Sequence, residues 1–277
     1  MTLRLADVTA LLDGWYDPGS AEDWDAVGLV CGDPDQPVRR VLFAVDPAPA
    51  VVAEAIEYGA DLLVCHHPLL LTPVHGVPAT SPKGRVVQDL VRAGCALLTA
   101  HTNADVPADG VNEALARAVG IVDPEVVLAS ERSEPGQVDR GHGRIGRLTA
   151  PTTLREFADR VSAALPATAH GVRVAGDPDR RVETVVVGSG SGDHLLDTVL
   201  GTGADVYVTS DLRHHRAAEF LEHERAALVD VAHWAAEWTW LPVVERKLTA
   251  AVRERGDTVE TRVSAVVTDP WTFRVDR

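Results

Sequence analysis

Six residues with metal-binding side chains follow the predicted strands of this sequence. They are His66, His67, His101, Asp105, His233 and Glu237. Imidazole and carboxylate groups together form a ligand set for zinc, manganese, iron or nickel. Because six such groups exceed the four ligands of a tetrahedral ion, their number favours a site with two ions.

Four of these residues repeat one spacing. His101 precedes Asp105 by four residues, and His233 precedes Glu237 by the same interval, each pair directly after a predicted strand. A lone histidine of this kind is more typical of a hydrogen-bonded core or surface residue. The recurrence of the pattern at equivalent strand ends favours a shared metal site instead.

The other two histidines form the step HHP with Pro68. Neighbouring residues in a strand point to opposite faces of the sheet, which would separate the rings of His66 and His67. At a strand end followed by proline the backbone turns, so we expect both rings to reach one site.

Short apolar runs alternate with helical patterns along the chain. In the first half the expected strands are 38–46, 60–67 and 95–101, with helices at 50–58 and 84–93. In the second half they are 182–187, 204–210 and 226–233, with helices at 193–200 and 214–224. This alternation predicts βαβ units and a largely parallel sheet, and ligands bind at the carboxyl ends of such strands.

The two halves are similar in sequence as well as in pattern. The segment YGADLLVCHHP (58–68) aligns without a gap with TGADVYVTSDL (202–212). Ser210 and Asp211 replace the histidine pair there, so we infer that the second half has lost these ligands. We interpret Asp211 and His214 as a pocket rim or as a helix start. The run GSGSG (188–192) fits either a phosphate-binding loop or a plain tight turn.

The duplication predicts the domain organisation. We expect a first α/β repeat at 1–129, a polar, glycine-rich connector at 130–150 and a second repeat at 151–277, with some mixing of the two. Amphipathic helices open the repeats at 6–13 and 154–165, and a helix at 242–255 with strands at 258–268 and 272–275 closes the chain. The expected fold class is α/β with mixed, mainly parallel sheets.

Composition limits the classes of function. The 277 residues carry 26 Lys+Arg against 41 Asp+Glu, a net charge of -15, which argues against binding to nucleic acid. No apolar run approaches the roughly 20 residues of a membrane span, and residues 1–10 lack the apolar core of a signal peptide. Three cysteines without CxxC spacing indicate reduced thiols. We expect a cytoplasmic protein without membrane partners.

Several motifs resemble one known family, the Nif-three-like dinuclear metal-centre proteins, often labelled GTP cyclohydrolase 1 type 2 homologues. The resemblance rests on WDAVGLVCGD (24–33), the HHP step, HTNADVPADGVNEALARAVG (101–120), GRIGRLTAPTTLREFA (143–158), GADVYVTSDLRHH (203–215) and DVAHWAAE (230–237). It implies two intertwined α/β repeats and a toroidal homohexamer with dinuclear sites facing an internal cavity.

The resemblance also implies which residues bind metal. The family's ligands fall on His66, His67, Asp105, His233 and Glu237. His101 lies beside them, as a further ligand or as a residue that orients one. Asp25 matches an acidic position near the site, although this chain reads WDA where the family pattern is WDN.

The favoured function is that of a metal-dependent hydrolase that acts on a small molecule. Two divalent ions, of zinc, iron, manganese or nickel, would lower the pKa of a bridging water and polarise the substrate. Glu237 or Asp105 is best suited to bridge the ions. The alternative is a non-catalytic assembly that binds or delivers metal, and nothing in the sequence specifies a purine pocket.

Overall fold

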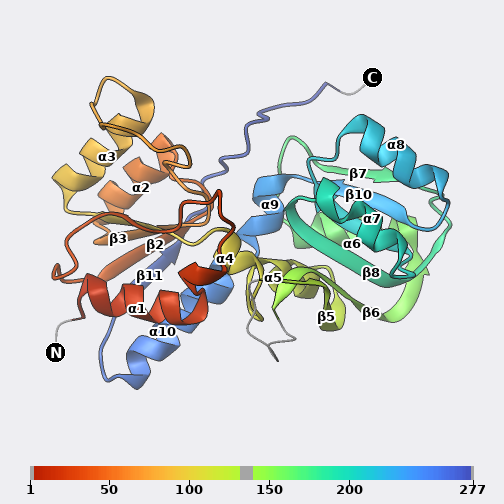
Figure 1. The fold of residues 1–277 in the computed structure, drawn as a ribbon, viewed down its shortest axis with the longest axis horizontal. Coiled ribbons are helices and arrows are strands. Elements are labelled where there is room, and N and C mark those ends of the chain that lie inside the picture. The colour runs from red at the N-terminus through yellow and green to blue at the C-terminus, as the bar shows by residue number, and fades with distance from the viewer. Residues whose placement is uncertain (1–2, 132–139, 276–277) are drawn as a thin grey trace. The chain divides into compact units, whose positions relative to one another are not determined.

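The computed structural model of the chain describes residues 3–131 and 140–275. The chain divides into two compact units. Unit 1 comprises Met1–Ala104 and Leu241–Thr268, and unit 2 comprises Asp105–Trp240 and Asp269–Arg277. Each unit contains one β-sheet with helices packed against it (Figure 1). Because the segment from Leu241 to Thr268 returns to unit 1, the units differ in extent from the two predicted repeats.

The sheet of unit 1 has the strand order β1-β4-β3-β2-β11. Its strands are β1 (Gly28–Cys31), β2 (Arg40–Ala44), β3 (Leu62–Cys65), β4 (Ala96–Thr99) and β11 (Glu260–Val263). All neighbouring pairs are parallel except β1 with β4. Every residue of the central strands β3 and β4 is buried, as expected of parallel strands covered on both faces.

Helices cover both faces of this sheet (Figure 1). They are α1 (Leu5–Trp15), the short helices η1 (Pro18–Ser20) and α4 (Thr102–Asp105), α2 (Pro49–Tyr58), α3 (Pro82–Ala93) and α10 (Leu241–Glu254). The Ser81 side chain caps α3 by accepting a hydrogen bond from the Gly84 amide (3.1 Å), and Gly94 ends the helix in the left-handed conformation (φ 69°). Local sequence therefore sets both ends of α3.

The sheet of unit 2 has the strand order β5-β6-β8-β9-β10-β7. Its strands are β5 (Ile121–Ala129), β6 (Gly141–Thr153), β7 (Val172–Ala175), β8 (Arg181–Ser191), β9 (Val206–Ser210) and β10 (Ala227–Val231). The strands β8, β9 and β10 are parallel, and the other neighbours are antiparallel. The carboxyl ends of the three parallel strands therefore meet at one edge of the sheet.

The helices of unit 2 are α5 (Val111–Ala118), α6 (Leu154–Ala164), η2 (Asp193–Leu195), α7 (Leu196–Leu200), α8 (His214–Glu222) and α9 (His233–Trp238). An apolar cluster joins η2, α7 and α8 to the sheet, with Leu196, Val199 and Phe220 against Tyr207 and Leu228. Helix α6 begins with a capping box, in which the Thr153 side chain and the Glu156 side chain each satisfy the other's backbone amide.

The predicted α/β fold class is confirmed, and each predicted βαβ element of both halves has a counterpart. Two expectations differ from the structure. Residues 272–275 form no strand, and β6 begins at Gly141, inside the predicted polar connector, of which residues 132–139 lie outside the described part. Among the described residues, the structure contains no helix that is long and apolar enough to span a membrane.

Candidate metal centre

Three histidine rings gather at the carboxyl edge of the unit 1 sheet. Because β3 and β4 are parallel, with Cys65 paired to Thr99, the residues that follow both strands emerge side by side. The ring centroids of His66 lie 5.1 Å from those of both His67 and His101, and His67 lies 5.5 Å from His101. One nitrogen of each ring lies within 4.8 Å of the others, so these rings could share a metal ion.

Each of these rings uses its Nδ1 atom for a contact within the protein. The partners are the Ala100 carbonyl oxygen for His66 (2.9 Å), Oδ1 of Asp46 for His67 (2.7 Å) and Oδ1 of Asp25 for His101 (2.8 Å). An imidazole that donates from Nδ1 to a carbonyl or carboxylate presents the lone pair of Nε2. This arrangement is typical of histidine ligands of metals.

Asp25 is a buried organising carboxylate. Its other oxygen, Oδ2, accepts hydrogen bonds from the amide and the hydroxyl of Thr102, while Oδ1 also accepts from the Ala26 amide (2.7 Å). Burial alone would raise the pKa of Asp25, but hydrogen bonds from His101 and Thr102 hold it well below its usual range. The backbone of Ala26 thus supplies a donor to Asp25 in the WDA motif.

In unit 2, His233 and Glu237 lie one turn apart on α9, directly after β10. Nε2 of His233 lies 2.8 Å from Oε1 of Glu237, and Nδ1 of His233 lies 2.6 Å from Oδ2 of Asp211. Asp211 follows β9 and adopts the left-handed conformation (φ 55°), which aspartate tolerates better than most residues. His233 therefore has the same arrangement as the histidines of unit 1, with Nδ1 held by an oxygen atom.

The charge of this pair is set by its surroundings. Burial would lower the pKa of His233, but the neighbouring Glu237 and the hydrogen bonds with Asp211 and Glu237 raise it to about 11. The His233 imidazole is therefore protonated at neutral pH, between the carboxylates of Asp211 and Glu237. A divalent cation would take the place of that positive charge.

The glycine run at 188–192 packs against the His233–Glu237 pair. Strand β8 continues through it to Ser191, and Gly190 adopts φ 65°. A Cβ atom at Gly190 would lie 2.9 Å from Oε1 of Glu237 and 3.3 Å from Nε2 of His233. The run lets the backbone approach these two side chains closely, a role that neither sequence interpretation included.

Asp105 lies at the end of α4 and contacts the same run. The Ser189 hydroxyl lies 3.5 Å from Oδ1 of Asp105, and the Asn112 side-chain amide donates to the Asp105 carbonyl (3.0 Å). The buried Arg144 side chain donates to the carbonyl oxygens of the next two residues, Val106 and Pro107 (3.0 Å each). The backbone after Asp105 is therefore anchored to β6.

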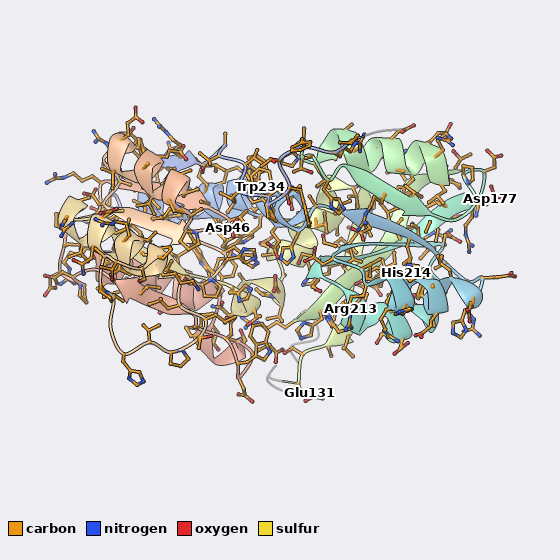
Figure 2. The ribbon with its side chains drawn as sticks, turned by 90° about the horizontal axis from the view of Figure 1, so that it is seen from above. Asp46, Glu131, Asp177, Arg213, His214 and Trp234 are labelled. Atoms are coloured by element: carbon orange, nitrogen blue, oxygen red, sulfur yellow. The ribbon has the colours of Figure 1, made fainter. Side chains whose placement is uncertain are left out.

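The structure places most of the predicted site residues beside others of the set. Within unit 1, Asp25 lies with His66, His67 and His101. Within unit 2, Asp211 lies with His233 and Glu237, and Asp105 contacts the glycine run. His214 instead starts α8 next to Arg213, with its ring 5.2 Å from that of His215 (Figure 2). It begins a helix and also lines a cavity of about 500 Å³, the two positions that the sequence suggested for it.

Two residues of these clusters were missed by the sequence analysis. Asp46 orients His67, and it ends the predicted strand 38–46, so its position at a strand end was a usable signal. Gly190 shapes the space next to Glu237, and only its place in a glycine run after a strand could have indicated it.

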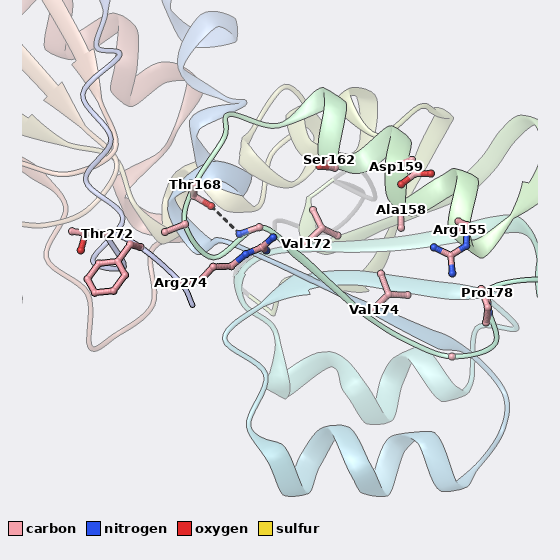
Figure 3. A pocket seen from close by; sticks show the side chains of 14 residues that line it. Arg155, Ala158, Asp159, Ser162, Thr168, Val172, Val174, Pro178, Thr272 and Arg274 are labelled. Atoms are coloured by element: carbon pink, nitrogen blue, oxygen red, sulfur yellow. Dashed lines mark hydrogen bonds between the residues drawn. The ribbon is translucent and has the colours of Figure 1, made fainter. Parts of the chain in front are cut away.

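Two cavities bear on where a substrate could bind. A cavity of about 740 Å³ in unit 2 lies between α6 and the start of β7, and none of the six metal-ligand candidates lines it (Figure 3). A smaller one of about 320 Å³ in unit 1 is lined by His67 and Asp46 together with Pro68, Leu69 and Lys83. Chemistry at His67 would therefore have a mostly apolar pocket beside it.

Comparisons with known proteins agree on one family. The family model Duf34/NIF3 (NGG1p interacting factor 3) matches residues 3–270. A Streptomyces coelicolor protein named GTP cyclohydrolase 1 type 2 homolog is 49% identical, over 98% of this chain and 95% of its own. A Mycobacterium tuberculosis protein of the same name is 37% identical, over 98% and 97%.

Solved structures show the same fold. The Bacillus cereus protein related to NIF3 superposes with a TM-score of 0.91 at 24% identity, covering 99% of this chain and 100% of its own. The Staphylococcus aureus hypothetical protein SA1388 superposes with a TM-score of 0.89 at 26% identity, with the same coverage.

Proposed function

The chain belongs to the Duf34/NIF3 family, and we propose that it is a metal-dependent hydrolase that binds two divalent ions per chain. The proposed ligands are His66, His67, Asp105, His233 and Glu237, with His101 as a further ligand or an orienting residue. Imidazole and carboxylate donors suit zinc, iron, manganese or nickel.

The observation that carries the proposal is the common arrangement of the histidine rings. His66, His67, His101 and His233 each hold Nδ1 against a carbonyl or carboxylate oxygen, at 2.6–2.9 Å. This arrangement fixes each ring so that Nε2 would be the coordinating atom, and at His233 a metal ion would replace the contact of Nε2 with Oε1 of Glu237. Four imidazoles set in this way fit a metal centre better than a set of unrelated core histidines.

The chemistry follows from the ligands. Bound divalent ions would lower the pKa of a water molecule toward neutrality and polarise the bond to be broken. The protein's own part is to fix the ligand geometry, which Asp25, Asp46 and Asp211 do through hydrogen bonds. The smaller cavity next to His67 offers room for an apolar portion of a substrate.

The first experiment measures metal and hydrolysis on the same samples. Protein purified without added metal is analysed for its elements, then assayed with GTP, for formate release, and with bis(4-nitrophenyl) phosphate. We expect about two ions per chain, fewer in Glu237→Gln, and full occupancy in the control Glu222→Gln, whose side chain is exposed on α8.

The outcomes separate the two candidate functions. Two ions with hydrolysis of either compound support the hydrolase. Two ions without hydrolysis of any compound in a wider ester and cyclic-amide panel favour the non-catalytic metal-binding assembly. Absence of metal after reloading with each candidate ion contradicts both functions.

We also propose that the protein assembles as a homohexamer. The family resemblance carries this proposal, and the exposed Trp24 (58%), Trp271 (65%) and Phe273 (78%) support it, because large exposed apolar side chains are typical of interfaces. Light scattering should give a mass near six chains, and a monomer at working concentration would contradict the assembly.

A further inference from the structure

A histidine outside the proposed ligand set lies at the same end of the unit 2 sheet as His233. Strands β7 and β10 are antiparallel, and their last pair at this end is Val172 with Val231. His170 lies two residues before Val172, and His233 lies two residues after Val231. The register therefore brings His170 to the sheet edge where the His233–Glu237 pair begins.

The His170 ring is held by a carboxylate. Its Nε2 atom lies 3.2 Å from Oδ1 of Asp230, whose Oδ2 accepts a hydrogen bond from the Arg173 guanidinium (2.7 Å). The side chains of His170 and Asp230 are only 13% and 10% exposed. An imidazole fixed in this way at one nitrogen presents the other in a defined direction, as in catalytic aspartate–histidine pairs.

The charge of His170 also affects the pKa values of two acidic groups, Asp269 and Asp211. Burial raises the pKa of Asp269, while the charge of His170 acts to lower it. The hydrogen bond with His233 is the main cause that lowers the pKa of Asp211, and the charge of His170 adds a smaller effect in the same direction. His170 thus contacts Asp230, which Arg173 also binds, and its charge acts on Asp211 in the loop after β9 and on Asp269 in the C-terminal segment.

The turn that carries His170 has its own support. The Thr168 hydroxyl accepts a hydrogen bond from the Gly171 amide (3.4 Å), and Gly171 adopts φ 66° (Figure 3). The lining of the large cavity includes Thr168, Ala169 and Gly171 but not His170. The ring is therefore directed toward Asp230, away from that cavity.

From this geometry we propose that His170 is the proton-transfer residue of the hydrolytic site and that Asp230 positions it. The role rests on the proposed hydrolase function. His170 takes a proton from the attacking water as its oxygen bonds to the electrophilic atom of the substrate. The imidazolium then gives that proton to the leaving group as the bond to it breaks, so no other reactant is needed.

The kinetic test compares His170→Ala with His223→Ala, an exposed histidine at the end of α8. With the metal-loaded protein and bis(4-nitrophenyl) phosphate, we expect His170→Ala to lower the rate about 10²- to 10⁴-fold with metal content unchanged. Added imidazole should restore part of this rate and leave His223→Ala unaffected. Asp230→Asn, which keeps His170, should give a smaller loss.

A second measurement does not depend on catalysis. The NMR signal of the His170 imidazole is assigned by its absence from the spectrum of His170→Ala. Addition of zinc should shift this signal and leave the His223 signal unchanged. A full rate in His170→Ala, or a rate loss without imidazole rescue and without a zinc response, would overturn the role of His170. Absence of hydrolysis in the unmodified protein would instead overturn the hydrolase proposal, and this role with it.

Discussion

Gly190 packs directly against Glu237, so closely that a Cβ atom at Gly190 would lie 2.9 Å from the carboxylate oxygen Oε1. The contact joins the end of β8 to the helix that carries two of the proposed ligands. Any side chain at this position would displace Glu237 or the strand.

The first prediction follows for Gly190→Ala. Its φ of 65° costs an alanine about 1–2 kcal/mol, and crowding against Glu237 adds to that cost. Gly203→Ala is the matched control, because Gly203 has φ 74° and no atom within 4 Å of an added Cβ. Both variants should unfold at lower urea concentration, but only Gly190→Ala should bind metal at least tenfold more weakly. Equal metal affinities in the two variants would show that the contact has no role.

The second prediction concerns the carboxylates that orient histidine rings. Asp46→Asn and Asp211→Asn each weaken the hydrogen bond to Nδ1 of a proposed ligand, so metal affinity should fall about 10- to 100-fold. Asp177→Asn, in the exposed turn between β7 and β8 (Figure 2), should leave it unchanged. Competition with a fluorescent chelator measures the affinities. Retained affinity in both site variants would contradict the orienting role.

The third prediction separates ligands from their neighbours. Loss of a ligand in His67→Ala or His233→Ala should abolish binding of at least one ion. If His101 only orients a ligand or a water, His101→Ala should lower affinity about 10- to 100-fold without loss of stoichiometry. His75→Ala, in an exposed loop, serves as the control. Calorimetric metal titration, with circular dichroism as a test of folding, distinguishes the cases: equal losses would make His101 a ligand.

The fourth prediction concerns the anchor of the segment after Asp105. Arg144 is 1% exposed, donates to four backbone carbonyls and lies 3.6 Å from Glu113. Arg144→Met leaves those four carbonyl acceptors without their donor, while Glu113 keeps Arg117 as its cationic partner, so the free energy of unfolding should fall by about 1–3 kcal/mol. The exposed Arg160→Met should change it by less than about 0.5 kcal/mol. Urea unfolding monitored by tryptophan fluorescence measures both free energies, and equal values for the two variants would contradict the anchoring role of Arg144.

The sequence allowed the βαβ order to be predicted because the parallel strands are buried on both faces and read as continuous apolar runs. Histidines at the ends of those runs stood out for the same reason. The rings at 66, 67 and 101 could be grouped in advance because parallel strands deliver their following residues to one edge of a sheet.

Other features are set by long-range contacts that no local pattern records. Strand β6 was not predicted because the buried Arg144 interrupts its apolar alternation. Hydrogen bonds to four backbone carbonyls compensate for the burial of the Arg144 charge. The strand expected at 272–275 has the alternating pattern of Trp271, Phe273 and Val275, but all three side chains are exposed and no strand of the described chain is hydrogen-bonded to the segment. The placement of His170 and His233 at the same end of the sheet depends on the register of β7 and β10, which sequence spacing does not reveal.

The return of Leu241–Thr268 to unit 1 sets an order of folding on the ribosome. Strand β11 pairs in parallel with β2, whose sequence lies more than 200 positions earlier, and α10 packs near it. Until β11 has been synthesised, one edge of β2 lacks its hydrogen-bonding partner, whereas the whole sheet of unit 2 is encoded before Leu241. The sheet of unit 2 can therefore complete its strand pairing before β11 of the unit 1 sheet has been synthesised. If translation stopped near Trp240, β2 would lack its β11 partner in the unit that carries His66, His67 and His101.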